Sequence, residues 1–365
     1  MNYVKYSVGL DVSKDDVKAC ILLMNDQQQS TVKATRSFGN RAEGFKAFLR
    51  WMDQHCKLSL PVSFTMEATG IYYEGLAWHL FQEQKTVAVV LPNKAKRYLQ
   101  SLGLKSKNDK IDAKGLALMG AQQALRPWQP LSPSLYGLRL LTRQHQSFTE
   151  HKTAMLNLVH AYSHSPFVSK AQLKRYKAMV AVYDKQLAAI KAEINALVAN
   201  DAVLNERVKK ITVVKGVSTL TVATVVAETN GFAAIENKRQ LCSYAGYDVV
   251  ENQSGKHVGR TKISKKGNSR IRRILHLAAL NAVRYQGGVF KDLFERVYGR
   301  SGVKMKGYVA VQRKLLQLIY HLWKNNEAFE DTLPTSSAEK EVAPTGGATL
   351  AEGSLQTRFA LREES

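Results

Sequence analysis

Two aspartates placed three positions apart among lysines are the first residues whose spacing suggests chemistry. They are Asp109 and Asp112, in the stretch 104–120. If a helix begins near Asn108, both carboxylates lie on one face of that helix. Neighbouring carboxylates repel each other, and a divalent metal ion relieves this repulsion better than mobile lysine charges do. The alternative is an ordinary first helical turn, in which two solvated acids are favoured by the helix dipole.

Two further acids lie upstream in apolar runs that are typical of strands. Asp11 stands between Leu10 and Val12, so in a strand its side chain points to the face opposite theirs. Glu67 is the last residue of a strand expected over residues 62–67. In open α/β sheets, active sites gather beyond the carboxyl ends of strands. Glu67 is therefore well placed for chemistry.

The elements around these acids follow one another in an informative order. The pattern predicts two strands joined by a tight turn over residues 6–24, a strand at 30–38, a helix at 40–55, a strand at 62–67, a helix at 71–84, a strand at 86–91 and a basic helix after Pro92. This order is the layout of the ribonuclease H fold, which predicts that the acids form one site. In the helix at 40–55, Asn40 and Glu43 predict a capping box. This helix is expected to bury Phe45, Phe48, Leu49 and Met52.

The overall charge favours a polyanionic partner. The chain has 365 residues with 45% hydrophobic content, enough for two or three domains with their own cores. It has 53 Lys and Arg against 30 Asp and Glu, a net charge of +23. Such an excess is typical of proteins that bind nucleic acid or an anionic membrane surface. The membrane alternative is weak, because no window approaches the roughly 18 to 20 apolar residues that span a bilayer.

Redox and targeting signals are few. Cys20, Cys56 and Cys242 are too scattered for a disulfide framework or a zinc site, so we expect reduced, buried thiols. Residues 1–10 lack the continuous apolar core of a signal peptide, and a cytoplasmic location is expected.

Three short motifs resemble those of a known family. They are Gly9-Leu10-Asp11-Val12-Ser13-Lys14, Met66-Glu67-Ala68-Thr69-Gly70 and Asn108-Asp109-Lys110-Ile111-Asp112-Ala113. In this order they resemble the motifs of the insertion-sequence transposases related to the Piv DNA invertase. The resemblance implies a RuvC-like amino-terminal domain whose metal-binding tetrad is Asp11, Glu67, Asp109 and Asp112, with Mg²⁺ or Mn²⁺ as cofactor.

Beyond residue 128 the pattern changes to two long amphipathic helices. Heptad positions in the first are Leu141, Phe148, Met155 and Tyr162. After Pro166, a second stripe consists of Leu173, Tyr176, Val180, Tyr183, Leu187, Ile190, Ile194 and Leu197. Such a stripe requires a partner helix, which is either the first helix folding back or the same helix of another subunit. We favour a hairpin that also joins subunits.

The region from residue 206 is typical of a compact helical domain. Residues 213–220 resemble the hairpin of helix-hairpin-helix modules, whose glycine lets backbone amides approach a phosphate. The alternative is a plain helix start capped by Ser218. No acid occurs between Glu251 and Asp292, where cations that favour phosphate contacts are crowded. They are Lys256, Arg260, Lys262, Lys265, Lys266, Arg270, Arg272 and Arg273; Lys94, Lys96 and Arg97 are further candidates, and a solvated basic face is the alternative.

The family resemblance also implies a nucleophile. Relatives carry a Ser-Gly pair a few residues after an Ala-Gly pair, and the serine attacks DNA. Ala245-Gly246 and Ser254-Gly255 match this arrangement, which implies that Ser254 is catalytic. The chain departs from the family pattern at Tyr247-Asp248-Val249, where a Leu-x-Pro is expected.

Four regions are therefore expected. They are a ribonuclease-H-like α/β catalytic domain over residues 1–127, a coiled-coil helical hairpin for oligomerisation over 128–205, a mainly α-helical transposase domain over 206–331, and a disordered tail over 332–365.

The resemblance implies a prokaryotic, nucleoid-associated transposase that exchanges DNA strands through a phosphoserine link. Donor and target DNA, a guiding bridge RNA and further subunits, as dimers that assemble into tetramers, are the implied partners. One alternative is a metal-dependent nuclease of the Holliday-junction or ribonuclease H type that hydrolyses with water. Another is a nucleic-acid-binding scaffold whose carboxylates are structural.

Overall fold

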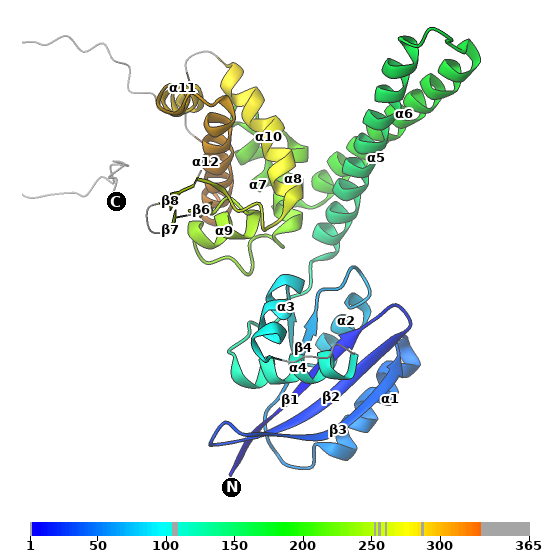
Figure 1. Cartoon of the computed structure of the whole chain (residues 1–365), viewed down its shortest axis with the longest axis vertical. Coiled ribbons are helices and arrows are strands. Elements are labelled where there is room, and N and C mark those ends of the chain that lie inside the picture. The colour runs from blue at the N-terminus through cyan, green and yellow to red at the C-terminus, as the bar shows by residue number, and fades with distance from the viewer. Residues whose placement is uncertain are drawn as a thin grey trace, which may run out of the picture. The chain divides into compact units, whose positions relative to one another are not determined.

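The amino-terminal part of the chain is built on a five-stranded mixed sheet (Figure 1). The computed structural model describes residues 2–103, 109–251, 253–254, 257–259, 261–285 and 288–329, with only the backbone at 109–110, 253–254 and 257–258. The strands are β1 (Tyr3–Val12), β2 (Asp16–Asn25), β3 (Ser30–Gly39), β4 (Val62–Glu67) and β5 (Thr86–Val90). Their order is β3-β2-β1-β4-β5; β1 to β3 are antiparallel, and β4 and β5 run parallel to β1. This topology is the ribonuclease-H-like arrangement that the order of elements predicted.

One face of the sheet is covered by α1 (Ala42–His55) and α2 (Glu74–Gln82). Alternate residues of β1, including Val8 and Leu10, are fully buried on this face. They pack with aromatic side chains of α1 and β4, such as Phe48 and Phe64, whose ring centroids are 6.1 Å apart. The period of two in the strand and the amphipathic helix thus produce a single apolar core.

The opposite face carries α4 (Asp109–Gln122), which packs directly on β1, with α3 (Pro92–Ser101) beside it. A Cβ atom on Gly9 would lie 2.0 Å from the Ala113 carbonyl oxygen and 2.3 Å from the Ala117 amide nitrogen. Any other residue in β1 at this point would overlap the helix backbone. Ser7 reinforces the contact, because its hydroxyl donates a hydrogen bond of 2.7 Å to the Ala117 carbonyl. The helix and strand therefore touch backbone to backbone.

The start of α1 differs from the sequence prediction. The helix begins at Ala42 after Arg41, and no side chain caps it, so the predicted Asn40 capping box was wrong. The Asn40 amide instead donates to the carbonyls of Ser13 at 2.8 Å and Tyr72 at 3.0 Å. Those two hydrogen bonds connect the β1–β2 turn to the segment before α2. Helix sequence patterns cannot reveal this role of Asn40, because its partners are distant in the chain.

Two smaller corrections concern the same layer. Trp51 is buried in the core, whereas Leu49 is only partly buried, because the apolar face of α1 is rotated toward Trp51. The next helix, α2, begins at Glu74, three residues later than expected, since residues 70–73 form a turn.

The two long helices form a hairpin within the chain. They are α5 (Pro133–Ser163) and α6 (Lys170–Asn200), and they lie side by side in Figure 1. Tyr183 of the predicted stripe packs edge-on against Phe148 with centroids 5.8 Å apart, and Tyr176 stacks on Tyr162 at the same distance. The partner helix that the stripe requires is therefore α5 of the same chain. Contact with another subunit stays a prediction.

The remaining helices form a second, larger core. They are α7 (Ala202–Thr212), α8 (Thr219–Glu228), α9 (Lys238–Ala245), α10 (Ser269–Arg284), α11 (Val289–Ser301) and α12 (Lys304–Asn325). The base of the hairpin, through Leu138 and Ile194, joins this core around α8, of which every residue from Thr221 to Glu228 is buried. None of the helices in the described ranges combines the length and apolarity that a bilayer-spanning segment requires.

All three cysteines are free thiols. Cys20 and Cys242 are buried as expected, but Cys56 is only half-buried. Burial raises the pKa of both Cys20 and Cys56 to about 11, so neither is a thiolate at neutral pH.

The close approach at Gly9 gives a first prediction. Gly9→Ala places a methyl group on the backbone of α4, and only a shift of the helix away from β1 relieves the overlap. We expect the free energy of unfolding, measured by urea denaturation, to fall by about 2–3 kcal/mol. Gly75→Ala in α2 is the matched control, because its nearest neighbours, atoms of the Phe45 ring, lie 3.7 Å and more away. Equal effects of the two substitutions would contradict the close approach.

Candidate active site

Asp11 and Glu67 lie next to each other at the carboxyl ends of two parallel strands. The pairing of β1 with β4 runs to Leu10 opposite Met66, one residue before each acid. Adjacent strands are about 4.8 Å apart, so the two acids are close neighbours. Both are half-buried. The sheet therefore brings together two acids that are 56 positions apart in the sequence.

The same two acids lie on the face that α4 covers. Residues two apart in a strand share a face, and Gly9, two before Asp11, touches α4. Thr65, two before Glu67, also faces the helix, since its hydroxyl would be 2.2 Å from a Cβ on Gly120. Asp11 and Glu67 therefore belong to the α4 side of the sheet, not to the core that α1 and α2 cover.

The direction of α4 places its first turn near these strand ends. Gly120 near the end of the helix lies against Ser7, and Ala113 lies against Gly9 further along β1. The turn before Ala113 consequently lies toward the end of the strand where Asp11 stands. It contains Asp112, which is half-buried, and Asp109, the first residue of the helix, whose side chain lies outside the description.

The donor set suits a hard divalent cation. Carboxylate oxygens are the ligands that Mg²⁺ prefers. Among the side chains that the structure describes, no three of His, Cys, Asp or Glu are grouped closely enough to hold a metal ion. Asp11, Glu67 and Asp112, whose side chains are described, thus share one end of the sheet without lying close enough together to hold a metal ion, and the side chain of Asp109 lies outside the described residues.

Ser254 lies in a small antiparallel ladder after α9. It belongs to β7 (Gln253–Ser254), which pairs with β8 (His257–Val258) so that Ser254 is opposite His257. A second short ladder, β6 (Val249–Val250) with β9 (Lys262–Ile263), flanks it. These ladders connect α9 to the basic stretch before α10. Two predicted nucleic-acid contacts, Lys256 and Arg260, lie outside the described residues.

Some of the predicted basic contacts are free to bind a ligand. Lys262, Lys265 and Lys266 are exposed, and their side chains have no ion pair or hydrogen bond within the described ranges. The same holds for the predicted cations of α3, which are Lys94, Lys96 and Arg97. Free, exposed cations on loops and helix surfaces are the residue type that contacts phosphates.

Three other predicted contacts are used inside the protein. Arg272 donates to the carbonyls of Ala245 at 2.7 Å and Gly267 at 3.1 Å, which closes the end of α9. Arg273 pairs with Glu150 of α5, and Arg270 lies 3.9 Å from a Glu228 oxygen. Their proposed role toward nucleic acid stays a prediction, but each already has a structural partner.

A buried carboxylate that the sequence analysis did not single out joins the hairpin to the second core. The side chain of Glu228, at the end of α8, is 3% exposed. It accepts two hydrogen bonds from the Arg143 guanidinium, at 2.7 and 3.1 Å, and one of 2.8 Å from the Asn268 amide. Burial alone would raise the pKa of Glu228, but these bonds together lower it below its usual range. The carboxylate therefore stays charged and holds α5 against α8.

The same carboxylate positions the start of α10. Asn268, which donates to Glu228, uses its side-chain oxygen to cap α10 by accepting from the amides of Arg270 and Ile271. The exposed Lys265 and Lys266 lie just before this cap, separated from it by Gly267. The available sequence signal was a lone acid at the end of a helix that otherwise has only apolar residues and threonines, because such an acid is rarely buried without a cationic partner.

The chain matches two family models. Residues 8–162 match a model described as a transposase and named for the DEDD transposases of IS110. Residues 208–295 match a model described as the transposase IS116/IS110/IS902 family.

Sequence relatives agree with these matches. The pilin gene-inverting protein of Moraxella bovis is 25% identical over 327 residues, which cover 89% of this chain and 98% of the relative. The protein of the same name from Moraxella lacunata gives the same identity and coverage.

Solved structures are more distant. RuvC from Thermus thermophilus aligns with 12% identity and a TM-score of 0.27, covering 34% of this chain and 99% of RuvC. The T. thermophilus RuvC in complex with a Holliday junction substrate aligns with a TM-score of 0.26.

Removal of the Glu228 charge should destabilise the helical region. In Glu228→Gln, the buried Arg143 contact loses its counter-charge. We expect the free energy of unfolding to fall by about 2–3 kcal/mol, less than for a fully buried pair because Arg143 is 34% exposed. The matched control is Glu206→Gln, whose exposed ion pair with Lys210 should contribute little. Equal stabilities of the Glu228→Gln and wild-type proteins in chemical denaturation would contradict this role.

The lowered pKa of Glu228 also predicts a pH dependence. A carboxyl whose pKa is lower in the folded state stabilises the fold above its unfolded pKa, about 4.3, and this stabilisation is lost as the pH falls through the folded value. The stability difference between wild type and Glu228→Gln should be constant near neutral pH and shrink below about pH 4.3. Denaturation of both proteins across this range measures it, and a difference that grows on acidification would refute the assignment.

Proposed function

The chain belongs to the IS110 family of transposases, and on that premise we propose that it cleaves and rejoins DNA with two cooperating groups of residues. The first is the carboxylate tetrad at the edge of the sheet, and the second is a serine nucleophile in the carboxyl-terminal domain. The observation that carries the proposal is the register of β1 and β4, which puts Asp11 beside Glu67 on the face that α4 covers.

Asp11, Glu67, Asp109 and Asp112 are proposed to hold Mg²⁺ or Mn²⁺. Oxygen-only ligands at the meeting point of two strand ends and a helix start suit these cations. When bound, the metal would polarise the scissile phosphate and offset its negative charge. The role of the chain is to hold the carboxylates in place, and the backbone contact at Gly9 supports this by keeping α4 against β1.

Ser254 is proposed to attack the DNA phosphate. Its oxygen forms a bond to phosphorus, the bond from phosphorus to one deoxyribose oxygen breaks, and that oxygen leaves as a hydroxyl. The serine proton passes to a base, and the leaving oxygen takes up a proton from an acid or from water. One phosphodiester thereby replaces another, so the bond energy is kept for rejoining. The link is to a 5′ or a 3′ phosphate, and subunits can share the work if Ser254 of one completes the tetrad of another.

The partners are proposed on the basis of charge and helix pattern. The net charge of +23 and the free lysines near α3 and α10 support binding of donor DNA, target DNA and a bridge RNA. Base pairing with an RNA would leave the protein to recognise backbone and shape. The hairpin of α5 and α6 is proposed as a coiled coil that also joins subunits into dimers and tetramers.

A denaturing adduct assay tests this mechanism. Purified protein, Mg²⁺, labelled DNA with the joined ends of the element, and the flanking transcript are mixed, and label attached to protein is measured. Ser254→Ala should remove the adduct, by about 10³-fold or more, because no other group supplies the bond to phosphorus. Asp11→Asn, Glu67→Gln and Asp112→Asn should reduce it strongly, and omission of the transcript tests RNA guidance.

Matched controls separate chemistry from folding in the same assay. Ser269→Ala, at the exposed start of α10, and Asp53→Asn, on the exposed side of α1, should keep the adduct. Cleaved DNA without an adduct, and undiminished by Ser254→Ala, would reject the phosphoserine step and favour hydrolysis by water. Unaltered strand exchange in Asp11→Asn would reject the carboxylate site.

A further inference from the structure

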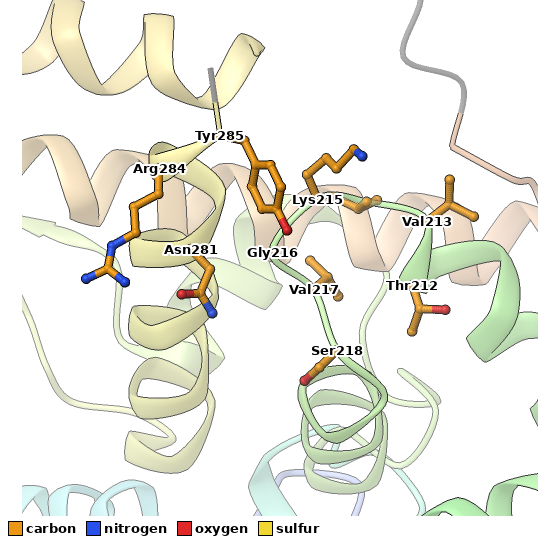
Figure 2. A pocket seen from close by; sticks show the side chains of 10 residues that line it. Thr212, Val213, Lys215, Gly216, Val217, Ser218, Asn281, Arg284 and Tyr285 are labelled. Atoms are coloured by element: carbon orange, nitrogen blue, oxygen red, sulfur yellow. The ribbon is translucent and has the colours of Figure 1, made fainter. Parts of the chain in front are cut away.

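An open groove of about 570 Å³ lies between the α7–α8 loop and the end of α10, and its described lining includes none of the proposed catalytic residues (Figure 2). One wall is the loop that joins α7 to α8, and the other is the last turn of α10 with the residue that follows it. The lining residues are Thr212, Val213, Val214, Lys215, Gly216, Val217, Ser218, Asn281, Arg284 and Tyr285.

The loop wall is held rigidly against α10. Val214 and Val217 are buried in the helical core on either side of Gly216. Gly216 has a φ of +87°, and a Cβ atom there would lie 2.6 Å from the Ala282 amide nitrogen and 2.8 Å from the Ala278 carbonyl oxygen. The residue must therefore be glycine, for both its conformation and its contact. One of the two sequence alternatives placed such an approach against a phosphate, whereas in the structure the glycine lies against α10.

The end of the loop matches the other alternative from the sequence. The Ser218 hydroxyl caps α8 by accepting from the Thr221 amide at 3.3 Å. Together, the buried valines, the glycine contact and the cap fix the shape of the groove. A preformed groove loses little conformational entropy when it binds a ligand.

The groove is positively charged. Lys215 lies on the loop wall and Arg284 on the helix wall, and both are exposed. Within the described ranges, neither side chain has an ion pair or hydrogen bond to a partner, and no carboxylate lines the groove. Two unpaired cations on opposite walls attract an anion with more than one charged group.

Neutral groups in the groove add to this preference. The amides of Lys215 and Gly216 have no acceptor among the described residues, and the exposed Asn281 offers a further donor. Tyr285 is 51% exposed, and the Lys215 ammonium lies 5.5 Å from the centre of its ring. Donors for phosphate oxygens beside an exposed aromatic face are the combination that holds a nucleic-acid strand, with the phosphates on the cations and a base on the ring.

We propose that this groove binds the sugar–phosphate backbone of a nucleic-acid strand, without regard to sequence, as an anchoring site separate from the reaction centre. The proposal rests on the proposed function only in that a transposase must grip nucleic acid. The openness of the groove suits a continuous strand that passes through.

The experiment measures binding by fluorescence anisotropy in EDTA, so that no cleavage occurs. The probes are a 20-base-pair DNA duplex, a single-stranded DNA and an RNA hairpin, all of arbitrary sequence. The variant Lys215→Ala with Arg284→Ala should weaken binding of at least one probe about tenfold and lower the slope of log K against log salt by about 1–2. The probe that is affected identifies the kind of strand.

The control removes two equally exposed cations elsewhere in the same region. Arg300→Ala with Lys304→Ala, at the end of α11 and the start of α12, makes the same change in net charge. It should alter binding by less than about threefold, and both double variants should unfold at the wild-type temperature, because all four side chains are exposed. Equal losses in the two double variants, or no loss in the groove variant, would overturn the proposal.

Tyr285 separates stacking from charge. Tyr285→Ala should weaken binding of a single-stranded probe about fivefold or more, whereas Tyr285→Phe, which keeps the aromatic face, should bind like wild type. Equal losses of affinity in Tyr285→Ala and Tyr285→Phe would refute stacking of a base on Tyr285 and, with it, the proposal that a nucleic-acid strand lies in the groove.

The outcome is distinct from that of the adduct assay. If the groove variants bind like the wild type and the protein forms the Ser254 adduct, the proposed binding role of the groove is rejected and the phosphoserine mechanism is retained. If the wild-type protein forms no adduct, and only the groove variants lose binding, the binding role of the groove is retained and the phosphoserine mechanism is rejected.

Discussion

The contact on which the rest of the amino-terminal domain depends is the one between the backbones of β1 and α4 at Gly9. A strand and a helix normally stay apart by the thickness of their side chains. Here the missing side chain of Gly9 lets the carbonyl of Ala113 and the amide of Ala117 lie directly on the strand. This contact fixes the distance of the helix from the sheet and the direction of its axis. The Ser7 hydroxyl is bound to the same turn of the helix.

This approach explains how the acids come to one edge. The pairing of β1 with β4 places Asp11 and Glu67 side by side, and the direction of α4 turns its first residues toward the same strand ends. On the other face of the sheet, β1 packs with α1 and α2 in the apolar core, and this packing holds the strand in place. A helix packed on ordinary side chains would sit further from the strand, and its first turn would lie further from the acids.

A second constraint, the buried Glu228, organises the helical part. It binds Arg143 of the hairpin and Asn268 at the start of α10, so one carboxylate orders two helices and the loop before one of them. The arginines that follow this loop are used in the structure, whereas Lys265 and Lys266 at its tip are exposed. In a strongly basic chain, the cations available to a nucleic acid are those without a carboxylate partner. Among the described residues, Lys215 and Arg284 of the groove are also of this kind.

The sequence by itself determined the element order, the strand on which Asp11 lies, the end at which Glu67 lies and the stripe on α6, because periodicity and turn residues act over short distances. The same local patterns predicted the sheet topology and the end of the sheet where the acids gather. Only the tertiary structure decided the use of Asn40, the burial of Trp51, the partners of Arg270, Arg272 and Arg273, and the groove around Gly216. Each of these depends on groups far apart in the chain, as the bonds from Ser7 to Ala117 and from Arg143 to Glu228 do. No local pattern encodes such partners, since their energies arise only after distant segments have packed.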